Sequence, residues 1–292
     1  MDLPSNLLHL VRENEDLSQH TWLRIGGPAQ YFSEPTSTEE LVDLLRAAAT
    51  NEIPVRVLGG GSNLVIRESG VDGLVVALSA AVFGRLEANG PKLTCGGGAK
   101  LSHAVTFAAG KGLSGLETLA AIPGTVGGAI AGNASASGTE IAQVTESVQL
   151  VSLEGEIVEK SNAEVRFSHR QSDLHGYIVL SAVFRLESME PNRLTKRTQQ
   201  TWIVRRSERP AGESRIAVPF VDPDTETAAS LIEQAGLKGA RRGGAELDTT
   251  SAAFLIVRDG ATSRDVLGLV ETIREQVHAK TGTDLQLGLK IW

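Results

Sequence analysis

Two glycine-dense segments constrain the fold of this chain more than any other feature of its sequence. They are Leu58-Gly59-Gly60-Gly61-Ser62-Asn63-Leu64 and Ile122-Pro123-Gly124-Thr125-Val126-Gly127-Gly128-Ala129-Ile130. Consecutive glycines have no Cβ atoms, so backbone N–H groups can approach an anion closely, and Ser62 and Asn63 add side-chain donors. We therefore predict a phosphate cradle for a dinucleotide.

A tight turn between two strands would explain one such segment equally well. Two segments in one chain, each followed by small and hydroxyl residues, favour the cradle. Neither segment is a Walker loop, because no Gly-Lys-Ser/Thr follows. Neither is a Rossmann fingerprint, because the first lacks the spaced third glycine and no clear helical pattern begins directly after it.

Composition and charge narrow the classes of partner. A net charge of −7 argues against binding to a nucleic acid polymer, which needs a basic surface. The single cysteine, Cys95, rules out an internal disulfide, and with six scattered histidines it predicts no metal site. No signal peptide and no membrane-spanning segment is predicted, so we expect a cytoplasmic protein with no membrane partner.

Hydrophobic periodicity predicts an α+β protein in three parts. Helical patterns lie at 39–49, 101–110, 195–206, 228–235 and 263–280, and strand patterns at 54–58, 73–78, 147–158, 177–186 and 252–257. Residues 210–224 are rich in Pro, Gly, Ser and Asp and predict a long loop. The predicted domains are residues 1–80, 81–194 and 195–292.

Several motifs together resemble the UDP-N-acetylenolpyruvoylglucosamine reductases, flavoenzymes of bacterial peptidoglycan precursor synthesis. The resemblance runs in order from about residue 18 to the C-terminus. Its motifs are the two glycine segments, Thr21-Trp22-Leu23-Arg24-Ile25-Gly26-Gly27-Pro28, Gly112-Leu113-Ser114-Gly115-Leu116-Glu117 and Gly236-Leu237-Lys238-Gly239.

This resemblance implies a two-subdomain FAD-binding module of the vanillyl-alcohol oxidase type, followed by an α+β substrate domain. It implies non-covalent FAD, NADPH as reductant and a UDP-sugar substrate, UDP-N-acetylglucosamine enolpyruvate, which is reduced to UDP-N-acetylmuramate. The residues expected to contact the cofactor are Gly59, Gly60, Gly61, Ser62, Asn63, Gly124, Thr125, Gly127, Gly128, Asn133 and Gly138.

Arg170 matches the arginine that polarises the substrate carboxylate in this family. Hydride addition beside a carboxylate builds negative charge on its oxygens, which a fixed guanidinium stabilises. Two other family positions depart from the pattern. Val218 stands where the family has its proton-donating serine or cysteine, and Gly288 stands where it has a glutamate.

These departures leave alternatives open. A working reductase would need another proton donor, for which Ser214, His169 or an ordered water are candidates. The alternative function is an FAD-binding homologue that has lost this chemistry and acts as another flavin oxidoreductase or a regulatory binder, and a purely structural protein is a third. The basic residues Arg205, Arg206, Arg209, Arg241 and Arg242 are expected either to contact the UDP diphosphate or to form a solvated face.

Overall fold

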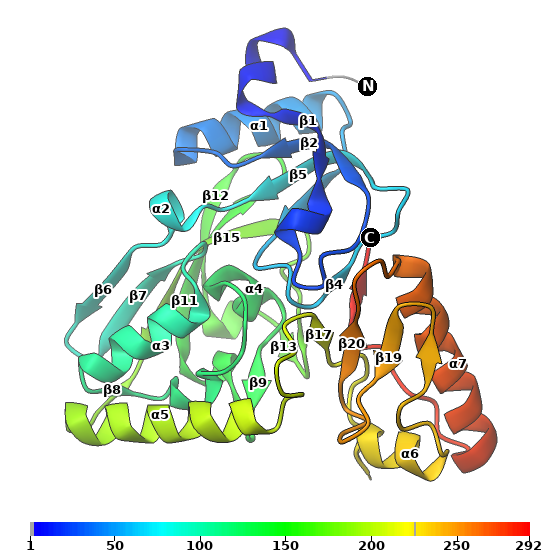
Figure 1. The fold of residues 1–292 in the computed structure, drawn as a ribbon. Coiled ribbons are helices and arrows are strands. Elements are labelled where there is room, and N and C mark those ends of the chain that lie inside the picture. The colour runs from blue at the N-terminus through cyan, green and yellow to red at the C-terminus, as the bar shows by residue number, and fades with distance from the viewer. Residues whose placement is uncertain (1–2, 225) are drawn as a thin grey trace. The chain divides into compact units, whose positions relative to one another are not determined.

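The computed structural model in Figure 1 describes residues 3–224 and 226–292. By their internal packing these residues form two compact units. Unit 1 comprises the described residues up to Glu13, together with Tyr31–Gly60 and Asp72–Arg206, and unit 2 comprises Asn14–Gln30, Gly61–Val71 and Ser207–Trp292. The predicted boundaries after residues 80 and 194 do not coincide with this division, and the three-domain organisation stays a prediction.

A four-stranded sheet holds the residues on either side of the first glycine loop. Its strand order is β1 (Arg12–Asp16), β2 (Pro28–Ser33), β5 (Val71–Ala77) and β3 (Val55–Leu58), with β3 and β5 parallel. Helix α1 (Thr38–Thr50) begins at Ser37, whose hydroxyl accepts the Glu40 N–H. Its buried leucines, Leu41, Leu44 and Leu45, pack with Leu74 and Val76 of β5.

A five-stranded antiparallel sheet forms the rest of the framework of unit 1. Its order is β12 (Ile157–Ser161), β11 (Thr145–Ser152), β15 (Tyr177–Arg185), β7 (Lys92–Gly96) and β6 (Leu86–Asn89). Helices α3 (Leu101–Gly110) and α4 (Val126–Ala131) lie beside this sheet (Figure 1). Their apolar residues share one buried core with residues of the sheet. The second glycine segment is therefore held on a buried core.

Shorter elements complete unit 1. They are the strand pairs β9 (Ser135–Ala136) with β10 (Thr139–Glu140), β13 (Phe167–Ser168) with β14 (Gln171–Ser172) and β8 (Leu113–Ser114) with β16 (Glu187–Ser188), the helices α2 (Ala80–Phe83) and α5 (Pro191–Ser207), and the 3-10 turns η1 (Ser5–Leu10), η3 (Glu117–Leu119), η4 (Ile141–Val144) and η5 (Asn162–Glu164).

Unit 2 is built from three separate stretches of chain. Its antiparallel sheet has the order β17 (Ile216–Ala217), β20 (Leu255–Val257), β19 (Ala245–Leu247) and β18 (Arg241–Arg242). Helices α6 (Ala228–Gln234) and α7 (Ser263–Thr281) pack on it around a shared apolar core. A parallel pair joins β4 (Leu64–Val65) to β21 (Lys290–Ile291), and η2 (Leu17–His20) lies in the first stretch.

The α+β class is confirmed, and two of the predicted segments need correction. Residues 147–158 form a hairpin of β11 and β12 rather than one strand, because Gly155 turns the chain with φ +82°. Residues 210–224 contain the short strand β17. Among the described residues, no helix is long and apolar enough to cross a membrane, and no group of three His, Cys, Asp or Glu could hold a metal ion.

Candidate active site

The two glycine segments meet inside unit 1. A Cβ placed on Gly60 would lie 2.6 Å from Gly124 Cα, and one on Gly59 would lie 2.9 Å from Thr125 Oγ1. Neither space can hold a side chain without moving backbone or the Thr125 hydroxyl. These glycines are therefore required first by the contact between the two segments, and not only by a ligand.

The first loop nevertheless offers unused donors. The N–H groups of Gly60 and Gly61 donate to no protein acceptor within residues 3–224 and 226–292, and Gly60 is exposed. Ser62 is half-buried, and Asn63 donates its side-chain amide to Gly288 O at 2.7 Å. A backbone with adjacent unpaired N–H groups and no Cβ between them fits a diphosphate.

The second segment is different, because its amides are already used. The N–H groups of Val126 and Gly127 donate to Ala99 O and Gly97 O, both at 2.8 Å, and Gly128 N–H donates to the Thr125 hydroxyl, which caps α4. The expectation that both segments present bare N–H groups is thus corrected at residues 126–128. Contact of Gly124, Thr125, Gly127 and Gly128 with the cofactor stays a prediction.

Arg170 lies in a two-residue turn. Ser168 pairs with Gln171 in the β13–β14 hairpin, so His169 and Arg170 form the turn between the strands. Arg170 is exposed and has φ +55°, a left-handed conformation that usually selects glycine at this position of a turn. A strained residue of this kind is more common at functional sites than elsewhere.

Asn133 holds this hairpin in place and has no exposed surface of its own. Its Nδ2 atom donates to Ser168 O and to Glu140 Oε2, both at 2.9 Å, and its Oδ1 atom accepts the Ala142 N–H at 3.3 Å. Contact between Asn133 and a cofactor, which the sequence predicted, stays a prediction. Its side chain is used inside unit 1.

His169 and Gly138 lie in two turns near Asn133 and Glu140. His169 Nδ1 lies 3.8 Å from Glu140 Oε1, and the His169 side chain is 62% exposed. Gly138 has φ +75° in the turn between β9 and β10, where Ser137 also has a positive φ, as a two-residue hairpin requires. Arg205 donates to the Ser137 hydroxyl at 2.9 Å.

Glu117, from the Gly112–Glu117 motif, is a buried carboxylate with several donors. It accepts from the Ser114 hydroxyl at 3.0 Å and the Gly115 N–H at 2.7 Å, and Arg197 of α5 lies 3.3 Å away. Burial alone would raise the pKa of Glu117, but these donors hold that pKa below its usual range. Glu117 therefore remains a charged anchor for α5.

In unit 2, the two positions that depart from the family pattern lie side by side. Gly288 N–H donates to Pro219 O at 2.8 Å, and Phe220 bridges Leu287. A Cβ placed on Gly288 would lie 3.5 Å from Val218 O, which is ordinary van der Waals contact. Two positions identified from separate motifs thus converge, and neither carries a polar side chain.

Ser214 does not lie at that point. It is exposed and precedes β17, four residues before Val218. Its role as a proton donor at the Val218 position stays a prediction.

The arginines of the basic group make separate contacts. Arg206 stacks over Trp202 at 5.0 Å in unit 1. In unit 2, Arg241 pairs with Glu246 at 2.7 Å and Arg242 donates to Gly268 O at 3.2 Å. The choice between diphosphate contact and a solvated face stays open for this group.

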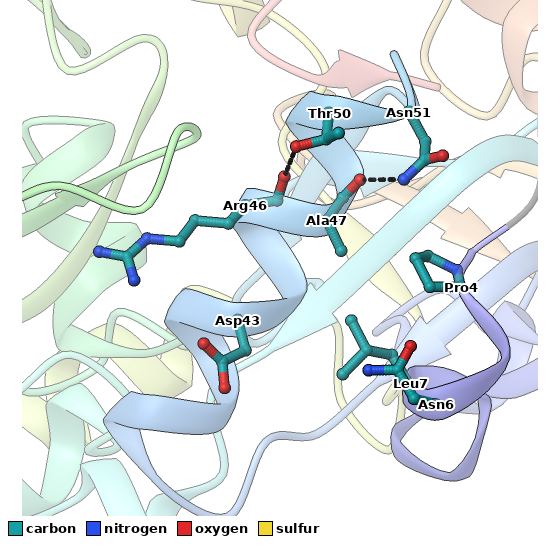
Figure 2. A pocket seen from close by; sticks show the side chains of 8 residues that line it. All are labelled: Pro4, Asn6, Leu7, Asp43, Arg46, Ala47, Thr50 and Asn51. Atoms are coloured by element: carbon teal, nitrogen blue, oxygen red, sulfur yellow. Dashed lines mark hydrogen bonds between the residues drawn. The ribbon is translucent and has the colours of Figure 1, made fainter.

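A surface hollow of about 360 Å³ lies on α1 and η1 (Figure 2). The Thr50 hydroxyl donates to Arg46 O and the Asn51 amide to Ala47 O, both at 2.8 Å, so these polar groups close the end of the helix. None of its lining residues belongs to either glycine segment. We assign it no part in the site.

Comparison with known proteins finds two family models that match separate parts of the chain. Residues 29–161 match the family model of an FAD binding domain, and residues 209–292 match that of the C-terminal domain of UDP-N-acetylenolpyruvoylglucosamine reductase. A reductase of that name from Rhodopirellula baltica is 47% identical over 289 residues, which cover 99% of this chain and 95% of the relative. The chain belongs to the UDP-N-acetylenolpyruvoylglucosamine reductase family.

Further members of the reductase family match over nearly the whole chain. A reductase from Bradyrhizobium sp. is 36% identical over 278 residues, covering 95% of this chain and 90% of that protein. The crystal structure of the reductase from Thermus caldophilus superposes with a TM-score of 0.83 at 31% identity, covering 97% of this chain and 99% of that one. The predicted family and its FAD-binding module are confirmed.

Two features of the site were not foreseen from sequence. Glu140 was not singled out, although it contacts both Asn133 and His169. The short helix α4 was missed because two of its six residues are glycines, which weaken any helical signal. A hydroxyl at Thr125, just before the helix, was the one available signal for its N-terminus.

Proposed function

We propose that this chain is an NADPH-dependent flavoenzyme that reduces UDP-N-acetylglucosamine enolpyruvate to UDP-N-acetylmuramate for peptidoglycan synthesis. The observation that carries this proposal is the similarity to named reductases over the whole length of both proteins. A homologue that had taken up another role would need to keep both the FAD-binding part and the reductase C-terminal domain without using the second.

FAD, when bound, would supply the redox chemistry that links NADPH oxidation to reduction of the enolpyruvyl double bond. The chain's own residues bind and orient the cofactor and the substrate. The unpaired N–H groups of Gly60 and Gly61 support the cofactor diphosphate, with Ser62 and Asn63 beside them. The Arg170 guanidinium holds the substrate carboxylate and stabilises the charge that develops there.

The proton source is the unusual part of this reductase. Val218 cannot donate a proton, and Gly288 cannot polarise a carboxylate. Ser214 lies before β17, four residues from Val218, and His169 is exposed in the Arg170 turn. We propose an ordered water as the donor, with His169 and Ser214 as the protein alternatives. Losing a positioned acid typically slows such a step by a factor of about 10² to 10⁴.

The UDP-sugar partner and the location follow from the same proposal. The nucleotide diphosphate is an anion that arginines bind through paired N–H groups, and the candidates are the five residues of the predicted basic group, Arg205, Arg206, Arg209, Arg241 and Arg242. A precursor enzyme acting on a nucleotide sugar is expected in the cytoplasm.

Two half-reactions test the function. Purified protein should be yellow, and anaerobic addition of NADPH should bleach the flavin. Mixing the reduced protein with UDP-N-acetylglucosamine enolpyruvate should restore the colour and yield UDP-N-acetylmuramate by mass spectrometry. Flavin that is reduced by NADPH but never reoxidised by this substrate would favour the alternative, an FAD-binding homologue that has lost the reductase chemistry.

A further inference from the structure

Asn133 is a buried residue of unit 1. Its side chain makes hydrogen bonds to Ser168 of the β13–β14 hairpin and to Glu140 and Ala142. We propose that Asn133 is a positioning residue that fixes the backbone turn from which the Arg170 side chain projects. The inference rests on the proposed function, in which Arg170 binds the substrate carboxylate. In this proposal Asn133 acts through the turn, since none of its own surface is exposed.

Three contacts tie the Arg170 turn to residues 131–140. Asn133 donates to Ser168 O, the last carbonyl of β13 before the turn, at 2.9 Å. On the other strand, the Ser172 hydroxyl donates to Ala131 O at 2.9 Å. Glu140, which Asn133 also contacts, lies 3.8 Å from His169 within the turn. Both strands and the turn are therefore anchored.

Arg170 depends on this anchoring because its side chain has no anchor of its own. Within residues 3–224 and 226–292 its guanidinium makes no hydrogen bond or ion pair. Its φ of +55° places an unfavourable backbone conformation in a turn of only two residues. Such a conformation persists when the surrounding structure over-determines it, and Asn133, itself at φ +40°, supplies the central contacts.

The consequence for the reaction is pre-organisation. A turn held in one conformation presents the Arg170 side chain from a fixed point of the backbone, so less freedom has to be lost when its guanidinium binds the carboxylate. If the Asn133 contacts are removed, the turn can relax and Arg170 can point elsewhere. Substrate binding and hydride transfer to the substrate should both suffer, whereas reduction of the flavin by NADPH should not.

The test compares Asn133→Ala with Asn162→Ala. Asn162 is a matched control, because its amide also donates to a backbone carbonyl of unit 1, Ala142 O at 2.8 Å, but does not touch the hairpin. We expect Asn133→Ala to keep its FAD and its rate of reduction by NADPH within about twofold. Reoxidation by UDP-N-acetylglucosamine enolpyruvate should fall about tenfold, with a higher Kd from flavin absorbance. Asn162→Ala should match the parent in every measurement.

A double-mutant cycle separates positioning from general destabilisation. In an Arg170→Lys background, Asn133→Ala should cause little further loss, because there is no planar fork left to orient. Full additivity, or equal loss in both half-reactions, would overturn the inference. If Asn133→Ala does not fold, Ser172→Ala removes the second anchor and should show the same split more weakly. Unchanged reoxidation in Arg170→Lys alone would instead overturn the role of Arg170 in the proposed function.

Discussion

Two glycines of this chain, Gly60 in unit 1 and Gly288 in unit 2, lie where backbone segments approach one another, yet for opposite reasons. At Gly60 a Cβ would lie 2.6 Å from Gly124 Cα, so glycine is required for the contact. At Gly288 the nearest atom would be 3.4 Å away, which any alanine would tolerate. The first glycine is needed by the packing, whereas the second leaves space that the packing does not need.

The two units differ in what they have kept of the family pattern. Unit 1 holds the contact between Gly60 and Gly124 and the anchored turn that carries Arg170, and both need particular backbone geometry. Unit 2 keeps the backbone pairing around Gly288 but has no polar side chain at Gly288 or Val218. The backbone at Gly288 and Val218 is thus paired and has room for larger side chains, so substitution can test whether polar groups at these positions speed the reaction.

The largest effect is expected from restoring both side chains. The double variant Val218→Ser, Gly288→Glu should speed reoxidation of the reduced flavin by the enolpyruvyl substrate by about 10²-fold, because it supplies a proton donor and a carboxylate. Stopped-flow absorbance measures the rate. Parent turnover already at an ordinary biosynthetic rate, about 1 to 10³ per second, would show that the absent side chains do not limit the reaction.

The two glycines themselves provide the next test. Gly60→Ala should lower the free energy of unfolding by about 1–3 kcal/mol through overpacking and should lower FAD content. Gly288→Ala should leave both within experimental error. Urea denaturation and the flavin-to-protein absorbance ratio measure the effects. Equal tolerance at both positions would mean that the contact between the glycine segments does not constrain unit 1.

A smaller effect is expected at Arg170. Arg170→Lys keeps the charge but removes the planar fork, so reoxidation by substrate should slow about tenfold while reduction by NADPH stays near normal. Rapid-mixing measurements of each half-reaction decide the matter. A loss shared equally by both would assign Arg170 to the flavin or to the fold.

The smallest effect is expected for Arg170→Gly, which should raise stability, whereas Gly60→Ala should lower it. Arg170→Gly removes a left-handed arginine, so the free energy of unfolding should rise by up to about 1 kcal/mol even as substrate-dependent reoxidation falls. Thermal and urea unfolding, read beside the half-reaction rate, give both quantities. A variant that is less stable than the parent would show that the turn is not strained.

The sequence predicted what depends on local pattern. The apolar spacing of residues 39–49 and 263–280 located α1 and α7, and motif matches located Arg170, Val218 and Gly288. Burial of Asn133 could not be predicted, because it depends on a carbonyl 35 residues away at Ser168. The contact between Gly60 and Gly124 is equally non-local, so a glycine run that suggested a ligand alone proved also to be a packing requirement.

The parallel pairing of β4 with β21 sets the order in which the molecule can assemble during synthesis. Leu64 pairs with Lys290, which is translated 226 residues later, and Arg67 N–H donates to Trp292 O. Unit 1 needs nothing beyond Arg206 and can mature while the ribosome is still working. Residues 63–67, next to the glycine loop, therefore lack their C-terminal backbone partners until translation is almost over.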